Sequence, residues 1–357
     1  MRKAIRFCLA LALVGAMAAG TAFAGETEAK IWGDGYVYFK SLTAEHEDAG
    51  LSYAKIDGFY EAYMYMQGVN KGDVWTTKAQ SGIYVYNGEV GVDSSNVYIY
   101  NDEYLFRAGS SDLGDATKNP SYFWGDKMDA GDELWKGGLY VKFGLRKVGL
   151  EVLFGTENDD NVQTVAYAVS YDKKIDDIDF SVEYETYSKA INEDVGASTT
   201  DDAGDDKDGI NDGAVGDNLG FGVAYDMDPF AIKFNYDMKS ETPGGPGAEA
   251  DEETSMMLSG DYKLDDVSGV SVVYQQIDTD QQYVSEDYGT LPLKYIETSI
   301  GVGYETAVGK FIIAVYYQMD SVEYDDEYAQ AYLLAYGEES VPAATENTLG
   351  VYLNMAF

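Results

Sequence analysis

The chain has 357 residues and a formal net charge of -39, with 63 Asp and Glu residues against 24 Lys and Arg residues. This charge repels nucleic acids and anionic lipid surfaces, so we expect no nucleic-acid partner. With one cysteine and one histidine, the chain lacks the ligands of common transition-metal sites and the base of hydrolytic triads. A carboxylate-pair enzyme stays open, but no pair of acids is singled out, and we expect no enzymatic activity.

The first 24 residues have the three parts of a secretory signal peptide. Three basic residues precede the apolar run 7–19, and Ala22-Phe23-Ala24 follows it. This order predicts cleavage before Gly25 and export from the cytoplasm. An uncleaved anchor is the alternative. The single cysteine, Cys8, lies inside this leader, so the mature chain has neither a thiol nor a disulfide.

From residue 25 onward, short segments alternate apolar and polar residues, and no apolar run is long enough for a transmembrane helix. Alternation with a period of two is typical of strands with one apolar and one polar face. About sixteen strands are predicted, at 31–39, 55–66, 76–86, 89–100, 103–109, 135–144, 146–155, 162–172, 178–187, 218–226, 230–239, 254–263, 267–277, 294–305, 310–319 and 347–357.

The connections between these strands alternate in length. Short turns are predicted at 101–102, 145–146, 173–177, 227–229, 264–266 and 306–309. Long links are predicted at 40–54, 110–134, 188–217, 240–253, 278–293 and 320–346. Such alternation indicates a barrel with short periplasmic turns and long extracellular loops. The least defined parts are the connection at 87–88 and the segment 328–336, which fits an extra strand or a loop helix.

The two faces of the predicted strands agree with a barrel in lipid. Phe230, Ile232 and Phe234 alternate with Lys233 and Asn235, and the same alternation continues in the last strand to Phe357. We therefore predict an all-β fold, a transmembrane antiparallel β-barrel of about 16 strands occupying residues 25–357, with a polar, water-filled lumen. A large secreted β-sandwich or β-helix is the alternative, and the terminal aromatic strand favours the barrel.

The segment 103–114, EYLFRAGSSDLG, resembles the fifth strand of the general trimeric porins of Gram-negative outer membranes, and Phe357 resembles their terminal aromatic residue. A narrower resemblance is to the homotrimeric porins of sulfate-reducing bacteria. The resemblance implies an outer-membrane location, insertion by the barrel assembly machinery, contact with outer-membrane lipids and a homotrimer. It also implies passive diffusion of ions and small hydrophilic solutes.

In the resembled family, the loop after the fifth strand folds into the barrel and forms the pore constriction. Here that loop is segment 110–134, and the resemblance implies basic wall residues Arg107, Lys136 and Lys142. The acidic constriction residues that it implies are Asp112, Asp115, Asp126, Asp129, Asp132 and Glu133. The segment lacks the family's Pro-Glu-Phe-Gly-Gly tip. With the negative net charge, these residues predict a cation-preferring channel, although adaptation to high salt explains the acidity equally well.

Two other functions stay open. A barrel with acidic loops serves equally as an adhesion or envelope-structural protein, or as a substrate-specific channel. In a predicted outer loop, Asp206, Asp208 and Asp212 are spaced like the calcium loops of thrombospondin type 3 repeats. They form a weak candidate Ca²⁺ site, with a solvated loop as the alternative, and no other cofactor is indicated.

Overall fold

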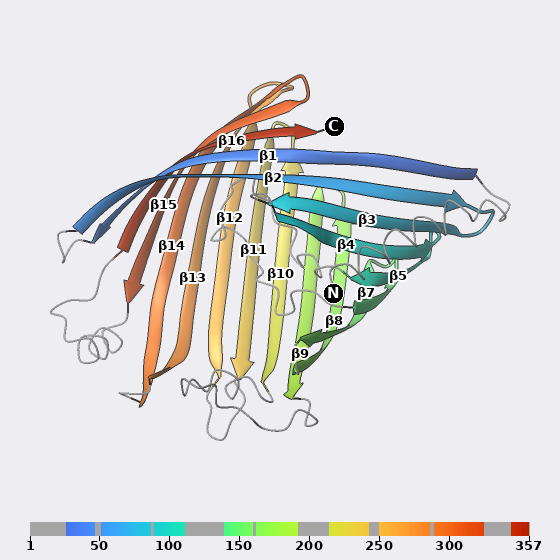
Figure 1. The fold of residues 1–357 in the computed structure, drawn as a ribbon, viewed down its shortest axis with the longest axis horizontal. Coiled ribbons are helices and arrows are strands. Elements are labelled where there is room, and N and C mark those ends of the chain that lie inside the picture. The colour runs from blue at the N-terminus through green and yellow to red at the C-terminus, as the bar shows by residue number, and fades with distance from the viewer. Residues whose placement is uncertain are drawn as a thin grey trace.

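The computed structural model describes residues 26–46, 51–86, 89–110, 139–159, 162–191, 214–242, 250–285, 289–324 and 344–356. Within these ranges, sixteen strands form one antiparallel sheet closed into a barrel (Figure 1). The strands are β1 Glu26–His46, β2 Leu51–Lys71, β3 Thr76–Tyr86, β4 Glu89–Tyr100, β5 Tyr104–Ser110, β6 Leu139–Leu145, β7 Leu150–Asp159, β8 Val162–Ile175, β9 Ile178–Ile191, β10 Val215–Met227, β11 Phe230–Thr242, β12 Asp251–Lys263, β13 Ser268–Ser285, β14 Gly289–Val308, β15 Phe311–Tyr324 and β16 Ala344–Ala356.

The barrel closes because the first strand pairs with both the second and the last. β1 runs beside β16 from Asp34 opposite Ala356 to His46 opposite Ala344, and beside β2 over its whole length. Each strand from β2 to β15 pairs with its two sequence neighbours. A closed sheet has no free edge, so each ladder hydrogen bond is satisfied within the sheet. Over the described part of the chain, no helix has the length and apolarity needed to cross a membrane.

The predicted fold class and strand number are confirmed, and the strand ends differ from the prediction. β1 and β2 continue to His46 and from Leu51, and β13 and β14 continue to Ser285 and from Gly289. The predicted long links 40–54 and 278–293 were therefore wrong. Backbone pairing persists there although the side-chain alternation has faded, because a hairpin ladder depends on main-chain hydrogen bonds. The connections at 87–88 and 328–336 lie outside the described residues.

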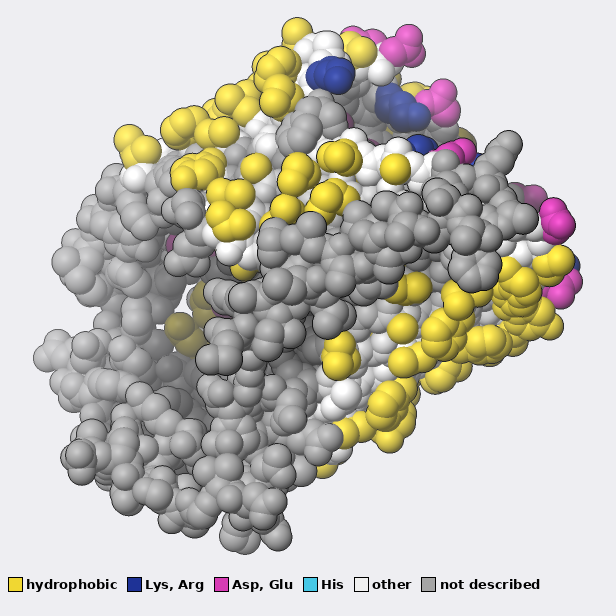
Figure 2. Space-filling view, turned by 45° about the vertical axis from the view of Figure 1, so that its right-hand side comes forward, with side chains coloured by type: hydrophobic (Ala, Val, Ile, Leu, Met, Phe, Trp, Pro, Cys, Tyr) yellow, Lys and Arg dark blue, Asp and Glu magenta, His cyan; other side chains and the backbone are white. Residues whose placement is uncertain are grey.

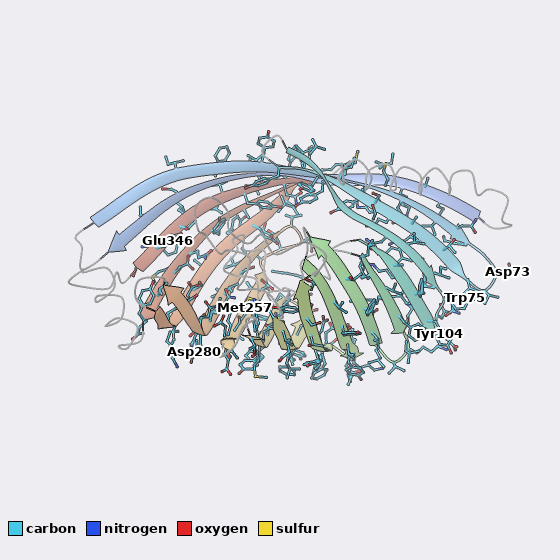
Figure 3. All side chains as sticks on the ribbon, turned by 60° about the horizontal axis from the view of Figure 1, so that its bottom comes forward. Asp73, Trp75, Tyr104, Met257, Asp280 and Glu346 are labelled. Atoms are coloured by element: carbon cyan, nitrogen blue, oxygen red, sulfur yellow. The ribbon has the colours of Figure 1, made fainter. Side chains whose placement is uncertain are left out.

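The barrel wall is apolar outside and polar inside. Phe230 and Ile232 on β11 are about half exposed, whereas Asn235 and Asp237 on the same strand are buried. Figure 2 shows hydrophobic side chains gathered on the outer surface. At the edge of this apolar surface, the rings of Trp75 and Tyr104 lie 6.4 Å apart, centroid to centroid (Figure 3). The fold thus inverts the usual arrangement of a soluble protein and suits surroundings of lipid outside and water inside.

One rim of the barrel carries the short connections between strands. They occupy residues 72–75, 101–103, 146–149, 176–177, 228–229, 264–267 and 309–310. All but the first of these were predicted as short turns, and their ends differ from the prediction by up to three residues. Polar side chains stabilise these turns by hydrogen bonds to backbone groups of the same turn. In one turn, the Val267 N–H donates to Asp265 Oδ1 at 2.9 Å and holds the pKa of Asp265 below its usual value. The short turns thus fix the neighbouring strands in register.

The turn between β4 and β5 gives a first test of this rim. Asn101 Oδ1 accepts hydrogen bonds from the backbone N–H groups of Glu103 (2.9 Å) and Tyr104 (2.8 Å). Asn101→Ala removes both, and we expect it to lower the free energy of unfolding by about 1 kcal/mol. Urea titration of the protein refolded into lipid measures this. Asp102→Ala in the same turn is the control and is expected to change stability by less than about 0.5 kcal/mol. An equal loss in both variants would contradict the role of the Asn101 side chain.

Tyrosine rings on the inner wall lie flat over glycines of the next strand. A Cβ added at Gly91, Gly216 or Gly350 would lie 2.2–2.3 Å from a ring carbon of its cross-strand tyrosine. Only a residue without a Cβ lets the ring approach the backbone so closely. The glycines therefore let large inner side chains lie along the wall instead of projecting across the lumen.

The pair Tyr316 and Gly350 tests this arrangement. In Gly350→Ala, the added Cβ would meet Tyr316 Cε1 at 2.2 Å, so the ring must turn into the lumen or the strands must separate. We expect a loss of roughly 1–3 kcal/mol in unfolding free energy. The double variant Gly350→Ala/Tyr316→Ala removes the clash, and its loss should be smaller than the sum of the two single losses. Additive losses in this cycle would show that ring and glycine do not interact.

Candidate functional site

A row of basic and aromatic side chains crosses the inner wall from β3 to β6. The register places Lys78 opposite Tyr98, Tyr98 opposite Arg107, and Arg107 opposite Lys142. Residues directly opposite in an antiparallel ladder project from the same face. That face is the inner one, because the alternate residues, such as Phe106 and Val141, are exposed apolar side chains on the outside. We call Lys78, Tyr98, Arg107 and Lys142 the basic row.

Arg107 is held in place by three neighbours. Its Nε donates to Asn96 Oδ1 at 3.3 Å, and its guanidinium carbon lies 5.1 Å from the ring centroids of both Tyr98 and Tyr140. The Tyr140 hydroxyl donates to the same Asn96 oxygen. Cation–π contacts contribute about 0.5–1 kcal/mol each where the cation is partly hydrated. The guanidinium therefore has a defined position on the wall and does not swing freely in the lumen.

The two lysines of the basic row have different surroundings. Lys142 Nζ lies 2.8 Å from Glu151 Oε2, and both side chains are about a quarter exposed. Lys78 Nζ lies 4.2 Å from the Tyr98 ring centroid. Glu151 offsets the charge of Lys142, so this lysine adds less positive field to the wall than an isolated lysine would.

The structure brings two of the predicted site residues together, Arg107 and Lys142 on the neighbouring strands β5 and β6. The third predicted wall residue, Lys136, lies outside the described residues. Three other sets of predicted residues also lie outside the described residues. They are the acidic candidates of segment 110–134, the three aspartates of the candidate Ca²⁺ loop, and Phe357.

Sequence reasoning missed Lys78, Asn96 and Tyr98. These residues alternate with Ala79 and Val97 in the sequence. Within each strand, this alternation was enough to predict that their side chains face the lumen. The alignment of Lys78 with Arg107 depends on the register of β3 on β4, which shifts at Gly82 and Ile83. That irregularity leaves no clear sequence signal.

The rest of the inner wall is polar and carries carboxylates. Glu185 on β9, Asp237 on β11 and Asp320 on β15 face inward and are buried. Asp320 accepts hydrogen bonds from Ser299 Oγ (2.5 Å) and from Gln318 Nε2 (2.8 and 3.0 Å). Where the structure describes the chain, no group of three or more His, Cys, Asp and Glu side chains is arranged to hold a metal ion. The described inner wall thus carries carboxylates on β9, β11 and β15, away from the basic row, as well as Glu151 beside Lys142.

The barrel is similar to solved outer-membrane proteins. A loop-deletion form of OmpT, an outer membrane protein of Vibrio cholerae, aligns with a TM-score of 0.66 at 14% identity, over 93% of this chain and 99% of that chain. The outer membrane channel DcaP of Acinetobacter baumannii gives 0.62 at 11%, over 94% and 100%. An anion-selective porin from Comamonas acidovorans gives 0.59 at 12%, over 93% and 100%.

No family model and no curated protein matches the sequence. The solved structures cover nearly the whole chain at low identity, so the likeness shows the fold alone. The chain has the fold of the outer-membrane β-barrel porins.

Proposed function

We propose that this protein is an outer-membrane porin, a water-filled channel for the passive diffusion of ions and small hydrophilic solutes. The observation that carries the proposal is the closed barrel with an apolar outer face and a polar, charged inner face. An apolar outer face and a polar, charged inner face are typical of barrels that enclose an aqueous channel in a membrane. The channel character of solved proteins with the same fold adds support.

The basic row is the proposed wall of the pore constriction. Arg107 and Lys142 stand midway along β5 and β6, and the six acidic residues of segment 110–134 belong to the connection between these strands. Acids on that segment facing bases on the wall would create a field across the pore. Such a field orients dipolar solutes as they pass.

Cation preference is the finer part of the proposal. It rests on the net charge of -39 and on the inward carboxylates Glu185, Asp237 and Asp320. The similarity to an anion-selective porin concerns the fold only, because selectivity follows from the charges that line each pore. Charges spread over the outer loops as an adaptation to salt would leave the pore less selective.

Export, assembly and oligomeric state complete the proposal. The leader would direct export, the barrel assembly machinery would insert the chain through its terminal strand, and lipid would cover the apolar outer face. We include a homotrimer, because one of the solved structures with this fold, OmpT of Vibrio cholerae, is described in a trimer form. Crosslinking in mild detergent tests the trimer independently of channel activity.

Liposome swelling separates the channel from an adhesion or envelope-structural barrel. Proteoliposomes holding the mature chain are placed in isotonic arabinose, and light scattering reports sugar entry. A channel gives swelling whose rate increases with the amount of protein, and stachyose should enter far more slowly because of its size. A rate equal to that of protein-free liposomes would contradict the porin proposal and favour a structural role.

A further inference from the structure

The wall of β1 and β2 carries two aromatic rings beside a lysine and a glutamine. In the ladder between these strands, Lys30 lies opposite Gln67, and Trp32 lies opposite Tyr65. Residues directly opposite in an antiparallel ladder project from the same face, and so do residues two apart along a strand. The four side chains therefore form one surface. We call Lys30, Trp32, Tyr65 and Gln67 the ring–lysine platform.

The platform faces the channel and not the lipid. Tyr65 is two residues along β2 from Tyr63, which lies opposite Tyr84 on β3. Tyr84 is one of the tyrosines whose rings lie over a glycine of the inner wall. Ile31, which alternates with the platform residues on β1, is 71% exposed on the outer face. Because successive residues of a strand project to opposite faces, the platform side chains project inward.

Solvent reaches every side chain of the platform. Lys30 is exposed. Trp32, Tyr65 and Gln67 are partly exposed. Gln67 lies five residues before the turn 72–75, so the platform lies near the rim that carries the short turns. A solute that enters or leaves the barrel at this rim therefore meets these side chains.

The rings of this region form a series of nearly parallel faces. Trp32 and Tyr65 lie 5.6 Å apart, centroid to centroid, with 22° between their planes. Tyr65 and Tyr63 lie 6.3 Å apart with 5° between their planes. Rings at these separations are offset, so part of each face stays uncovered. Among the described residues, Trp32 has no other ring contact, so a flat solute ring can extend the series there.

The other half of the platform offers hydrogen-bond donors. The Lys30 ammonium has three N–H donors and a positive charge, and the Gln67 amide has two N–H donors. Within the described ranges, neither side chain has a hydrogen bond or an ion pair. The neighbouring carboxylate of Glu28 is paired elsewhere, with its Oε1 3.0 Å from Lys71 Nζ. Lys30 and Gln67 are therefore available to an anionic oxygen of a solute.

The charges beside the platform give it a direction. Two residues beyond Trp32 on β1 stands Asp34, and two residues beyond Gln67 on β2 stands the residue opposite Lys78 of β3. An acidic residue thus follows the ring end of the platform, and a basic residue follows the polar end. A solute that carries a ring and a carboxylate has its lowest electrostatic energy with the carboxylate toward Lys30.

We propose that the ring–lysine platform binds aromatic carboxylates, in which a flat ring and a carboxylate are joined by a short alkyl chain. The ring would lie against Trp32, and the carboxylate would accept hydrogen bonds from Lys30 Nζ and the Gln67 amide. Neighbours on one face of a strand are about 6.6 Å apart, which a ring, two methylene groups and a carboxylate can span. This inference rests on the proposed porin function and names a solute class for it.

Block of the ion current by phenylpropionate tests the platform. The mature chain is inserted into planar bilayers, and phenylpropionate is compared with two analogues. Phenylpropanol keeps the ring but is neutral, and cyclohexylpropionate keeps the charge but has no flat ring. We expect phenylpropionate to reduce the current with saturation. Its half-block concentration should be about fivefold lower than that of either analogue, a difference of about 1 kcal/mol.

Substitutions assign the two kinds of contact. Trp32→Leu should remove the advantage of phenylpropionate over cyclohexylpropionate, because the ring face is lost. Lys30→Gln should remove its advantage over phenylpropanol, because the charge is lost. Trp75→Leu is the matched control, since Trp75 lies near the same rim at the edge of the apolar outer surface and is 42% exposed (Figure 3). This control should behave as the parent.

Three results would overturn the platform: equal, non-saturating effects of the three solutes, an unchanged titration in Trp32→Leu or in Lys30→Gln, or the same change in Trp75→Leu. Channels that conduct normally but show any of these results fail this inference and leave the porin proposal standing. Circular dichroism of each variant confirms that the strands have formed. Lys30→Gln replaces an exposed side chain and keeps the test decisive if Trp32→Leu does not fold.

If no channel conducts, the porin proposal fails first, and the platform is tested by binding alone. The detergent-solubilised chain is titrated with phenylpropionate in a calorimeter. Heat in the parent that is lost in Trp32→Leu and reduced in Lys30→Gln supports the platform. No heat in the parent, or equal heat in the parent and both variants, overturns it.

Discussion

Gly149→Ala is expected to lower the unfolding free energy by several kcal/mol and to reduce the yield of folded barrel, whereas Gly309→Ala is expected to cost only about 1 kcal/mol. Both glycines lie in short turns on the same rim, with φ of +83° and +68°. A Cβ at Gly149 would lie 1.7 Å from the Asp172 carbonyl oxygen. At Gly309 no atom lies within 4 Å of the added Cβ.

The difference between the two sites arises from what blocks the Cβ. At Gly149 the obstacle is backbone of β8, which cannot rotate away as a side chain would. The Asp172 N–H also donates to the Gly149 carbonyl at 2.7 Å, so moving β8 aside breaks a hydrogen bond between strand and turn. Gly309→Ala keeps every contact, and its only destabilising effect is the cost of holding an alanine in the left-handed backbone conformation.

Urea titration of both variants, refolded into the same lipid and followed by tryptophan fluorescence, measures the two losses. Gly309→Ala controls for the left-handed conformation, so the excess loss in Gly149→Ala reports the clash alone. Equal losses at the two positions would contradict the close packing of the β6–β7 turn against β8. A fully stable Gly149→Ala would contradict the geometry of this turn altogether.

Arg107→Gln is expected to increase the ratio of cation to anion permeability about fivefold, because one charge at about 4 Å from a passing ion in water is worth about 1 kcal/mol. Arg107 is the best-held cation of the basic row, between the Tyr98 and Tyr140 rings. Glutamine keeps a polar group that can donate to Asn96 but removes the positive field.

Zero-current potentials in a salt gradient give this permeability ratio for the parent and the variant. Lys263→Gln is the matched control, because Lys263 is exposed at the short-turn rim, where it pairs with Asp228. That variant should change the ratio by less than about twofold, since exposed charges are screened by salt within about 10 Å. Equal changes in the two variants would show that overall charge, rather than the basic row, controls permeation.

Much of the barrel could be predicted from side-chain alternation and turn chemistry. On β11, alternate residues such as Phe230 and Ile232 identified the outer face, and the residues between them, Asn235 among them, the inner face. Turns such as 228–229 and 264–267 were predictable because Asp and Pro interrupt the alternation there. A barrel follows once such strands are numerous and linked by alternating short and long connections.

The candidate site was less predictable, because it depends on long-range register. Arg107 and Lys142 were predicted as wall residues from parity and family resemblance, and the structure places them opposite one another. Lys78 joins them only through the shifted β3–β4 ladder, and Trp32 meets Tyr65 only across the β1–β2 ladder. Such cross-strand neighbours are far apart in sequence, and an error of one residue in register reverses every face.

The most direct test of the channel is the single-channel current of the mature chain in a planar bilayer with a tenfold KCl gradient. We expect stepwise conductance increments as single barrels insert, with a zero-current potential whose sign shows that K⁺ passes more readily than Cl⁻. A potential of the opposite sign would contradict the cation preference. A bilayer that stays silent, although the folded barrel has inserted, would contradict the channel itself.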